Sequence, residues 1–153
     1  VFVFGSDAAG DADKNRSGLQ ELNQFAGPDG LVFDPRGILW IQTDNRASEV
    51  TEYTNEQMLA VVPSRLTDSA GKQVPLNATN QVELRRFLVG PNGCEVTGLA
   101  FTADQTALFA NIQHPRNWPL SDDASEVTPA GTSLRPRAAT VLITKVDGTP
   151  VGI

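Results

Sequence analysis

The carboxylate of Glu95 is the first candidate for chemistry in this sequence, because of the residues around it. It stands in the stretch 90–98, Gly-Pro-Asn-Gly-Cys-Glu-Val-Thr-Gly, directly before an apolar run typical of a β-strand. A carboxylate at the start of such a strand can ligate a hard cation such as calcium, which prefers oxygen ligands. The same stretch is also typical of a glycine-rich turn that carries a surface glutamate. The local sequence leaves both interpretations open.

Aspartates occupy a comparable place earlier in the chain. Asp29 lies in Gly-Pro-Asp-Gly (27–30), just before another β-like run, and Asp44 ends the strand that follows. Pro-Asp-Gly is first of all a turn signal, and turns also favour aspartate at strand ends. The position of Asp29 before a strand nevertheless makes it a further candidate metal ligand.

Histidine and arginine supply the remaining candidates. His114 is the only histidine, and a lone histidine is more often a packing residue than a metal ligand. Both roles stay open for it. Arg137 follows Arg135 after one proline, and an arginine suits bidentate contact with a phosphate group. Arg137 is therefore the candidate substrate contact, although two such arginines are equally compatible with a solvated edge.

Several other kinds of site are excluded. Cys94 is the only cysteine, so the chain forms neither an internal disulfide nor a cysteine-rich zinc site. No base or cation adjoins it in the sequence, and we expect a buried or spectator thiol. The phosphate-binding loop, the His-Glu-x-x-His motif and the Gly-x-Ser-x-Gly motif are absent from the sequence. Nucleophilic serine or cysteine catalysis within this chain is therefore unsupported.

The composition is that of an acidic globular domain. Of the 153 residues, 40% are hydrophobic and 20% are charged, and the formal net charge is -6. An acidic surface argues against nucleic acid or an anionic membrane as a partner. The apolar runs are only a few residues long, so we expect no membrane span.

An internal repeat organises most of the chain. Residues 30–34 and 38–42 form a strand–turn–strand pattern that recurs at 98–102 and 107–111, each with Gly-Leu-x-Phe in the first strand. Turn residues such as Pro35 and Gly37 indicate hairpins. Further strands are expected at 57–62, 82–88 and 139–145, with a long loop at 63–79. Short strands repeated at this spacing predict a mostly β fold, a partial β-propeller with about two blade-like antiparallel units, and a small β-sandwich is the alternative.

The first 26 residues differ from the rest. Residues 1–4 form a short β-like run, and apolar residues at helical spacing over 18–25 predict one short N-terminal helix that Ser17 caps. We therefore divide the chain into an N-terminal strand and helix segment (1–26) and a propeller-blade region (27–153). Two blade-like units close no ring, so we expect a piece of a larger protein and a possible dimer through exposed blade edges.

Taken together, the motifs resemble the C-terminal part of the PhoX-type alkaline phosphatases over about residues 20–148. Each motif alone is common, but the set, its order and its approximate spacing are specific. The motifs are Pro28-Asp29-Gly30-Leu31, Phe33-Asp34-Pro35-Arg36-Gly37, Leu39-Trp40-Ile41-Gln42-Thr43-Asp44, Gly93-Cys94-Glu95-Val96-Thr97-Gly98, Asn111-Ile112-Gln113-His114-Pro115 and Arg135-Pro136-Arg137-Ala138-Ala139-Thr140.

The resemblance implies a secreted or periplasmic bacterial enzyme with a six-bladed propeller. It implies hydrolysis of phosphomonoesters by a cluster of calcium and iron ions in the propeller channel. Glu95 is the residue carried over as a metal ligand, and Asp29 is a second. His114 and Arg137 receive only a possible ligand or phosphate-contact role, and the family's iron-binding cysteine lies upstream, so Cys94 does not match it. A partial ring supplies a partial cluster, and we expect the chain alone to be inactive.

Two other classes of function stay open. One is a calcium- or ligand-binding propeller module without catalysis, of the lactonase-like kind that shares the Pro-Asp-Gly-Leu hairpin. The other is a purely structural or interaction domain. A calcium-binding module would be stabilised by calcium without hydrolysing phosphomonoesters, and a structural domain would respond to neither.

Overall fold

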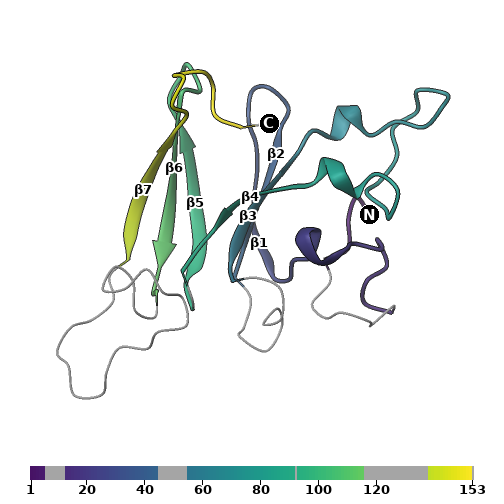
Figure 1. The fold of residues 1–153 in the computed structure, drawn as a ribbon, viewed down its shortest axis with the longest axis horizontal. Coiled ribbons are helices and arrows are strands. Elements are labelled where there is room, and N and C mark those ends of the chain that lie inside the picture. Colours follow the sequence, from purple (N-terminus) through teal and green to yellow (C-terminus); the bar gives the residue numbers. More distant parts are fainter. Residues whose placement is uncertain (6–12, 45–54, 92, 116–137, 153) are drawn as a thin grey trace.

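The computed structural model describes residues 1–5, 13–44, 55–91, 93–115 and 138–152, and these form two antiparallel β-sheets (Figure 1). The first sheet has four strands in the order β1-β2-β3-β4, and the second has three in the order β5-β6-β7. The strands are β1 (Pro28–Phe33), β2 (Leu39–Thr43), β3 (Gln57–Val61), β4 (Arg85–Val89), β5 (Glu95–Phe101), β6 (Ala107–Gln113) and β7 (Ala139–Thr144). Three short 3₁₀ turns, η1 (Glu21–Asn23), η2 (Pro63–Arg65) and η3 (Gln81–Glu83), complete the described elements.

The first sheet is a meander in which every strand pairs with the next one along the chain. Its two central strands are buried throughout, because they are apolar enough to be covered on both faces. The edge strand β1 is mostly exposed, and its side chains include Leu31 at 63% and Phe33 at 60% exposure. An exposed edge strand can pair with a second copy of the chain. The dimer through exposed blade edges therefore stays a prediction.

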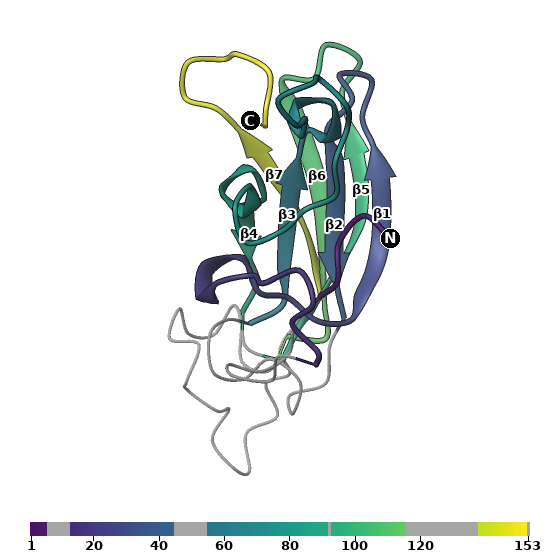
Figure 2. The same ribbon diagram turned by 90° about the vertical axis from the view of Figure 1, so that its right-hand side faces the viewer.

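The second sheet lies beside the first and shares a core with it. Along β6 the burial alternates, so that Leu108, Ala110 and Ile112 face inward, as expected for a strand covered on one face. These side chains pack with Trp40 and Met58 of the first sheet in one apolar cluster. Figure 2 shows the two sheets one in front of the other, with the strands of each side by side and running roughly along the vertical of the view.

A second apolar cluster covers the other face of the first sheet. Leu59 and Val61 of β3 pack there against Leu66 and Leu76 from the segment between β3 and β4, and against Phe25 from the N-terminal segment. The segment between β3 and β4, predicted as a loop, contains η2 and an isolated bridge between Thr67 and Gln73. The first sheet is therefore covered on both faces.

The repeat and its hairpins are confirmed. The two copies of the pattern are the hairpins β1–β2 and β5–β6, with Phe33 opposite Leu39 and Phe101 opposite Leu108. Gly37 has a φ of 80°, a left-handed conformation that favours glycine, and this closes the first hairpin. The mostly β class is correct, but the described residues form two open sheets and no closed propeller ring.

The predicted N-terminal helix is wrong. The structure has only the 3₁₀ turn η1 there, because side chains bind the backbone groups that a helix would use. The amide of Asn15 donates to the Leu19 carbonyl and accepts from the Leu19 N–H. Gln81 accepts from the Gln20 N–H, and Leu22 is 72% exposed, so the apolar spacing does not mark one buried face.

Two further boundaries also differ from the sequence prediction. Residues 1–4 form no strand, since Phe4 donates its N–H to the Ser17 hydroxyl and not to a neighbouring strand. The strand expected at 82–88 begins only at Arg85, after η3. No helix in the described part of the chain is long and apolar enough to cross a membrane.

Candidate metal centre

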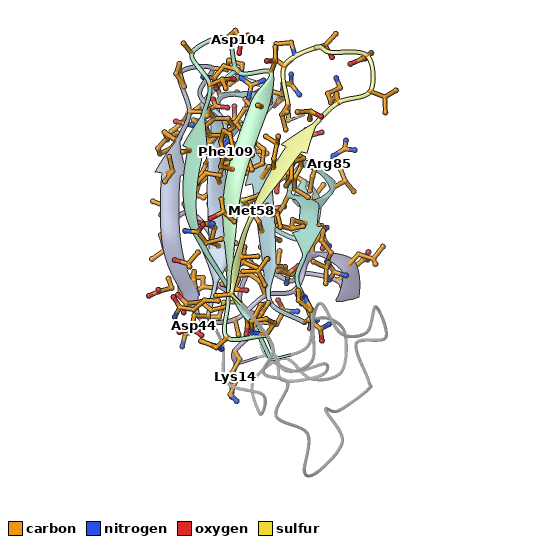
Figure 3. The ribbon with its side chains drawn as sticks, turned by 90° about the vertical axis from the view of Figure 1, so that its left-hand side faces the viewer. Lys14, Asp44, Met58, Arg85, Asp104 and Phe109 are labelled. Atoms are coloured by element: carbon orange, nitrogen blue, oxygen red, sulfur yellow. The ribbon has the colours of Figure 1, made fainter. Side chains whose placement is uncertain are left out.

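Three side chains that can ligate a metal ion converge at one end of the two sheets. Asp44, Glu95 and His114 each offer a ligand atom, and these atoms all lie within 4.8 Å of one another. Figure 3 shows Asp44 at the lower end of the strands, opposite the turn that carries Asp104. The group joins residues that are up to 70 positions apart in the sequence, and only the folded chain brings them together.

Strand pairing explains why these three residues meet. Glu95 is the first residue of β5 and lies opposite Gln113, the last residue of β6, so His114 follows beside it. Asp44 comes directly after β2 in the first sheet. A hydrogen bond of 3.1 Å from Gln42 Nε2 to the Gly98 carbonyl oxygen joins β2 to β5 and holds the two sheets in this relation.

Glu95 is the most enclosed member of the group, with 9% of its surface exposed. Gln113 Nε2 donates to Glu95 Oε2 at 2.7 Å and holds the carboxylate from one side. His114 Nε2 lies 3.6 Å from the same oxygen, too far for a hydrogen bond but close enough for both atoms to bind one ion. A buried carboxylate held this way is suited to a hard cation.

The imidazole of His114 is oriented as a metal ligand. Its Nδ1 lies 3.0 Å from the Gly93 carbonyl oxygen, which only accepts hydrogen bonds, so Nδ1 carries the proton. In the neutral imidazole Nε2 is then the nitrogen without a proton, and it faces Glu95. A carbonyl that fixes the ring through its second nitrogen is the usual support of a metal-binding histidine.

The backbone of His114 is also unusual. Its φ is 39°, in the left-handed region that residues other than glycine seldom occupy. Strained conformations of this kind persist where the surrounding structure imposes them, and they gather at functional sites. The sequence left the role of His114 open, and the structure places it in the group.

Asp44 is the member of the group that sequence analysis did not identify as a candidate ligand. It was evident as the residue that ends its strand, but we interpreted it as a turn residue. Its backbone N–H donates to the Gly27 carbonyl oxygen at 2.9 Å, and its side chain is exposed. The signal available in the sequence was its place at the end of an apolar strand. Only the structure shows that this strand packs against the one that begins with Glu95.

The remaining candidates from the sequence are Asp29 and Arg137. Asp29 is exposed at an irregularity in β1, where the pairing with β2 shifts between Pro28 and Gly30, and it is not a member of the group. Arg137 and Arg135 lie outside the described residues. Neither the phosphate contact predicted for Arg137 nor a ligand role for Asp29 therefore receives structural support.

Cys94 is a buried spectator, as expected. Its side chain is 2% exposed and packs in the cluster between the sheets. Burial raises the pKa of the Cys94 thiol to about 12, and the negative charges of Glu56, Glu95 and Asp44 add to the shift. The thiol packs as a small apolar group beside the three carboxylates.

Comparison with known proteins places these residues in a family. The family model described as alkaline phosphatase PhoX matches residues 1–116. Among solved structures, the chain is similar to Pseudomonas fluorescens PhoX in complex with vanadate, a transition state analogue, with a TM-score of 0.69 and 34% identity. No curated protein matches the chain.

The two matches cover most of this chain but only part of the related structure. The similarity covers 98% of this chain but 23% of the P. fluorescens PhoX chain, so this chain spans about a quarter of that structure. The family model covers well over half of the present sequence, including Asp44, Glu95 and His114. This chain therefore belongs to the PhoX family of alkaline phosphatases.

Proposed function

We propose that this chain is the part of a metal-dependent alkaline phosphatase that contributes Asp44, Glu95 and His114 to the metal centre. The full-length protein would hydrolyse phosphomonoesters. The observation that carries the proposal is the convergence of two carboxylates and an oriented imidazole in a chain of the PhoX family. The vanadate bound to the related P. fluorescens PhoX, a transition state analogue, supports phosphoryl chemistry in such a protein.

The donor set fits the calcium and iron that the resemblance implies. Asp44 and Glu95 supply the carboxylate oxygens that calcium prefers, and the Nε2 of His114 suits iron, which accepts imidazole readily. Bound ions of this kind clamp phosphoryl oxygens and neutralise the charge that develops during transfer. The residues of this chain would hold and orient those ions, with Gln113 and the Gly93 carbonyl keeping the ligands in place.

The described ligands make an incomplete centre. Calcium takes more oxygen ligands than Asp44 and Glu95 provide, so the remaining ligands would come from other parts of the full-length protein. We therefore expect the isolated chain to bind metal weakly and to hydrolyse little. A periplasmic or secreted location and a phosphate contact by Arg137 also remain proposals that follow from the family.

Glu95→Gln in the full-length protein tests the function most directly. The amide keeps the shape of the side chain but removes the charge that holds a cation. We expect the variant to lose bound metal and at least 100-fold in the hydrolysis of p-nitrophenyl phosphate, on the order of the losses seen when catalytic electrostatics are removed. Glu83→Gln is the matched control, because Glu83 lies in η3 outside the group.

The outcomes separate the possible functions. Loss of metal and activity in Glu95→Gln, with neither lost in Glu83→Gln, supports the phosphatase. Calcium-dependent stabilisation of a full-length protein that hydrolyses no phosphomonoester would favour the calcium-binding module without catalysis. If neither metal binding nor hydrolysis is found in the full-length protein, the proposed function is wrong and a structural role is favoured.

A further inference from the structure

The hydroxyl of Thr43, next to the ligand Asp44, is fully buried and lies between two strands. Thr43 is 0% exposed and is the last residue of β2. Its Oγ1 accepts the backbone N–H of Gln57 at 2.9 Å and donates to the carboxylate of Glu56. The buried hydroxyl therefore both donates and accepts a hydrogen bond. A hydrogen bond to an ionised carboxylate is stronger than one between two neutral groups. The end of β2 is therefore tied to the start of β3 through this one side chain.

The start of β3 is itself anchored on both sides. Gln57 is fully buried, and its side chain donates to the Gln24 carbonyl oxygen at 2.7 Å and accepts from Arg86 Nε at 2.8 Å. Glu56 is 5% exposed. Of the two partners of Thr43, Gln57 is therefore joined to both the N-terminal segment and β4, and Glu56 is buried beside it.

Asp44 depends on this arrangement, because its own side chain is exposed. Its backbone is held from one side by the bond from its N–H to the Gly27 carbonyl oxygen, and from the other side by Thr43. An exposed carboxylate loses rotational freedom when it binds an ion. A fixed backbone leaves only the side chain to be ordered, and this lowers the cost of binding.

We propose that Thr43 is a positioning residue that aims Asp44 at the metal centre, with Glu56 holding the Thr43 hydroxyl. The inference rests on the proposed function, in which Asp44 is a ligand. Groups that orient a metal ligand typically change metal affinity by about 10–100-fold when they are removed. Thr43 touches neither ion nor substrate in this role, and acts only through the position of Asp44.

Four substitutions in the full-length protein test the proposal. Thr43→Val removes the hydroxyl and keeps the shape, whereas Thr43→Ser keeps the hydroxyl. Glu56→Gln weakens the acceptor, and Asp44→Asn removes the ligand charge. Thr102→Val is the matched control, because the Thr102 hydroxyl bonds Asp104 Oδ1 at 2.6 Å in the turn at the opposite end of β5 and β6. The metal-free proteins are titrated with calcium chloride and with iron(III) citrate. Bound metal is measured by atomic emission after dialysis, and p-nitrophenyl phosphate hydrolysis is followed in parallel.

We expect Thr43→Val to raise the metal concentration for half-maximal activity by about tenfold or more, and saturating metal to restore kcat to within about twofold. Thr43→Ser and Thr102→Val should stay within about threefold of the parent, and Glu56→Gln should lie between these and Thr43→Val. A simple folding defect would lower activity without this rescue by metal. If Thr43→Val fails to fold, Glu56→Gln and Thr43→Ser still test the same hydrogen bond.

Other results would overturn the proposal in distinguishable ways. If Asp44→Asn weakens metal binding but Thr43→Val and Glu56→Gln do not, Thr43 has no positioning role and the proposed function stands. Loss of metal in Glu56→Gln as large as in Asp44→Asn would make Glu56 a ligand. If Asp44→Asn leaves metal affinity unchanged, Asp44 is not a ligand, and both the positioning role and the proposed set of ligands are wrong.

Discussion

His114 Nδ1 lies 3.0 Å from the carbonyl oxygen of Gly93, across the open end of the β5–β6 hairpin. This contact directs the other ring nitrogen toward Glu95, at 3.6 Å from Oε2. The histidine thereby acquires a ligand geometry from a backbone atom 21 residues earlier in the chain. The contact leads to a first prediction about metal binding.

His114→Ala should lower the metal affinity of the full-length protein by at least about tenfold, because it removes an oriented imidazole. His114→Asn should not restore the affinity, since its amide does not place an unprotonated nitrogen at the same point. Metal content after dialysis, measured by atomic emission, checks the prediction. Lys145→Ala, at the exposed end of β7, serves as the control. Equal metal content in all three variants would exclude His114 as a ligand.

Asp34 should be a stabilising residue that has no part in the metal centre. Its buried carboxylate accepts from the Arg36 guanidinium at 2.7 Å and from Trp40 Nε1 at 3.3 Å, and the same guanidinium also donates to the Val151 carbonyl oxygen. Asp34→Asn breaks the ion pair and should lower the free energy of unfolding by about 3 kcal/mol. Urea denaturation measures this loss, and unchanged metal affinity in the folded variant confirms that the effect is structural.

The contribution of Asp34 should depend on pH in a defined direction. Burial raises the pKa of Asp34, but the hydrogen bonds from Arg36, Ile38 and Trp40 outweigh it and hold the pKa below its ordinary value of 3.8. The stabilisation is therefore complete above that value and is lost as the pH falls through the lower pKa of the folded state. The difference in free energy of unfolding between parent and Asp34→Asn should shrink as the pH is lowered below about 4. A constant difference would contradict this assignment.

Two glycines with positive φ give a matched test of packing between the strands. Gly37 has a φ of 80°, and a Cβ added there would meet nothing within 4 Å, whereas a Cβ at Gly98, with a φ of 58°, would lie 2.5 Å from Asn111 Nδ2. Both alanine variants should lose about 1–2 kcal/mol from backbone strain. Gly98→Ala should lose more than Gly37→Ala, because the Asn111 amide must move away from the added Cβ while its Oδ1 accepts from the Thr140 hydroxyl at 2.8 Å. Equal melting temperatures for the two variants would show that Asn111 moves aside freely.

The Cys94 thiol should be inert in the folded protein. It is 2% exposed, and a Cβ at Gly90 would come within 2.4 Å of its Sγ, so no alkylating reagent has room to approach. Mass spectrometry should find Cys94 unmodified after incubation with iodoacetamide and fully modified once urea unfolds the chain. Rapid modification under native conditions would mean that the core between the sheets opens readily.

Much of the β architecture could be predicted from the sequence, because its causes are local. The Gly-Leu-x-Phe repeat, the turn at Pro35 and Gly37, and the apolar runs of β2 and β6 each specify a strand or a hairpin from neighbouring residues. The family resemblance was also contained in short motifs. The N-terminal helix was mispredicted because the side chains of Asn15 and Gln81, the second far away in sequence, capture backbone groups that a helix needs.

The candidate metal centre could likewise be predicted only in part from the sequence. The sequence by itself determined that Glu95 stands at the start of a strand, where a carboxylate can serve as a ligand. Only the tertiary structure decided that Asp44 and His114 join it and that Asp29 does not. The physical reason is that ligand atoms meet through strand pairing within the second sheet and through the packing of β2 against β5, and neither relation is encoded by the residues adjacent to a ligand.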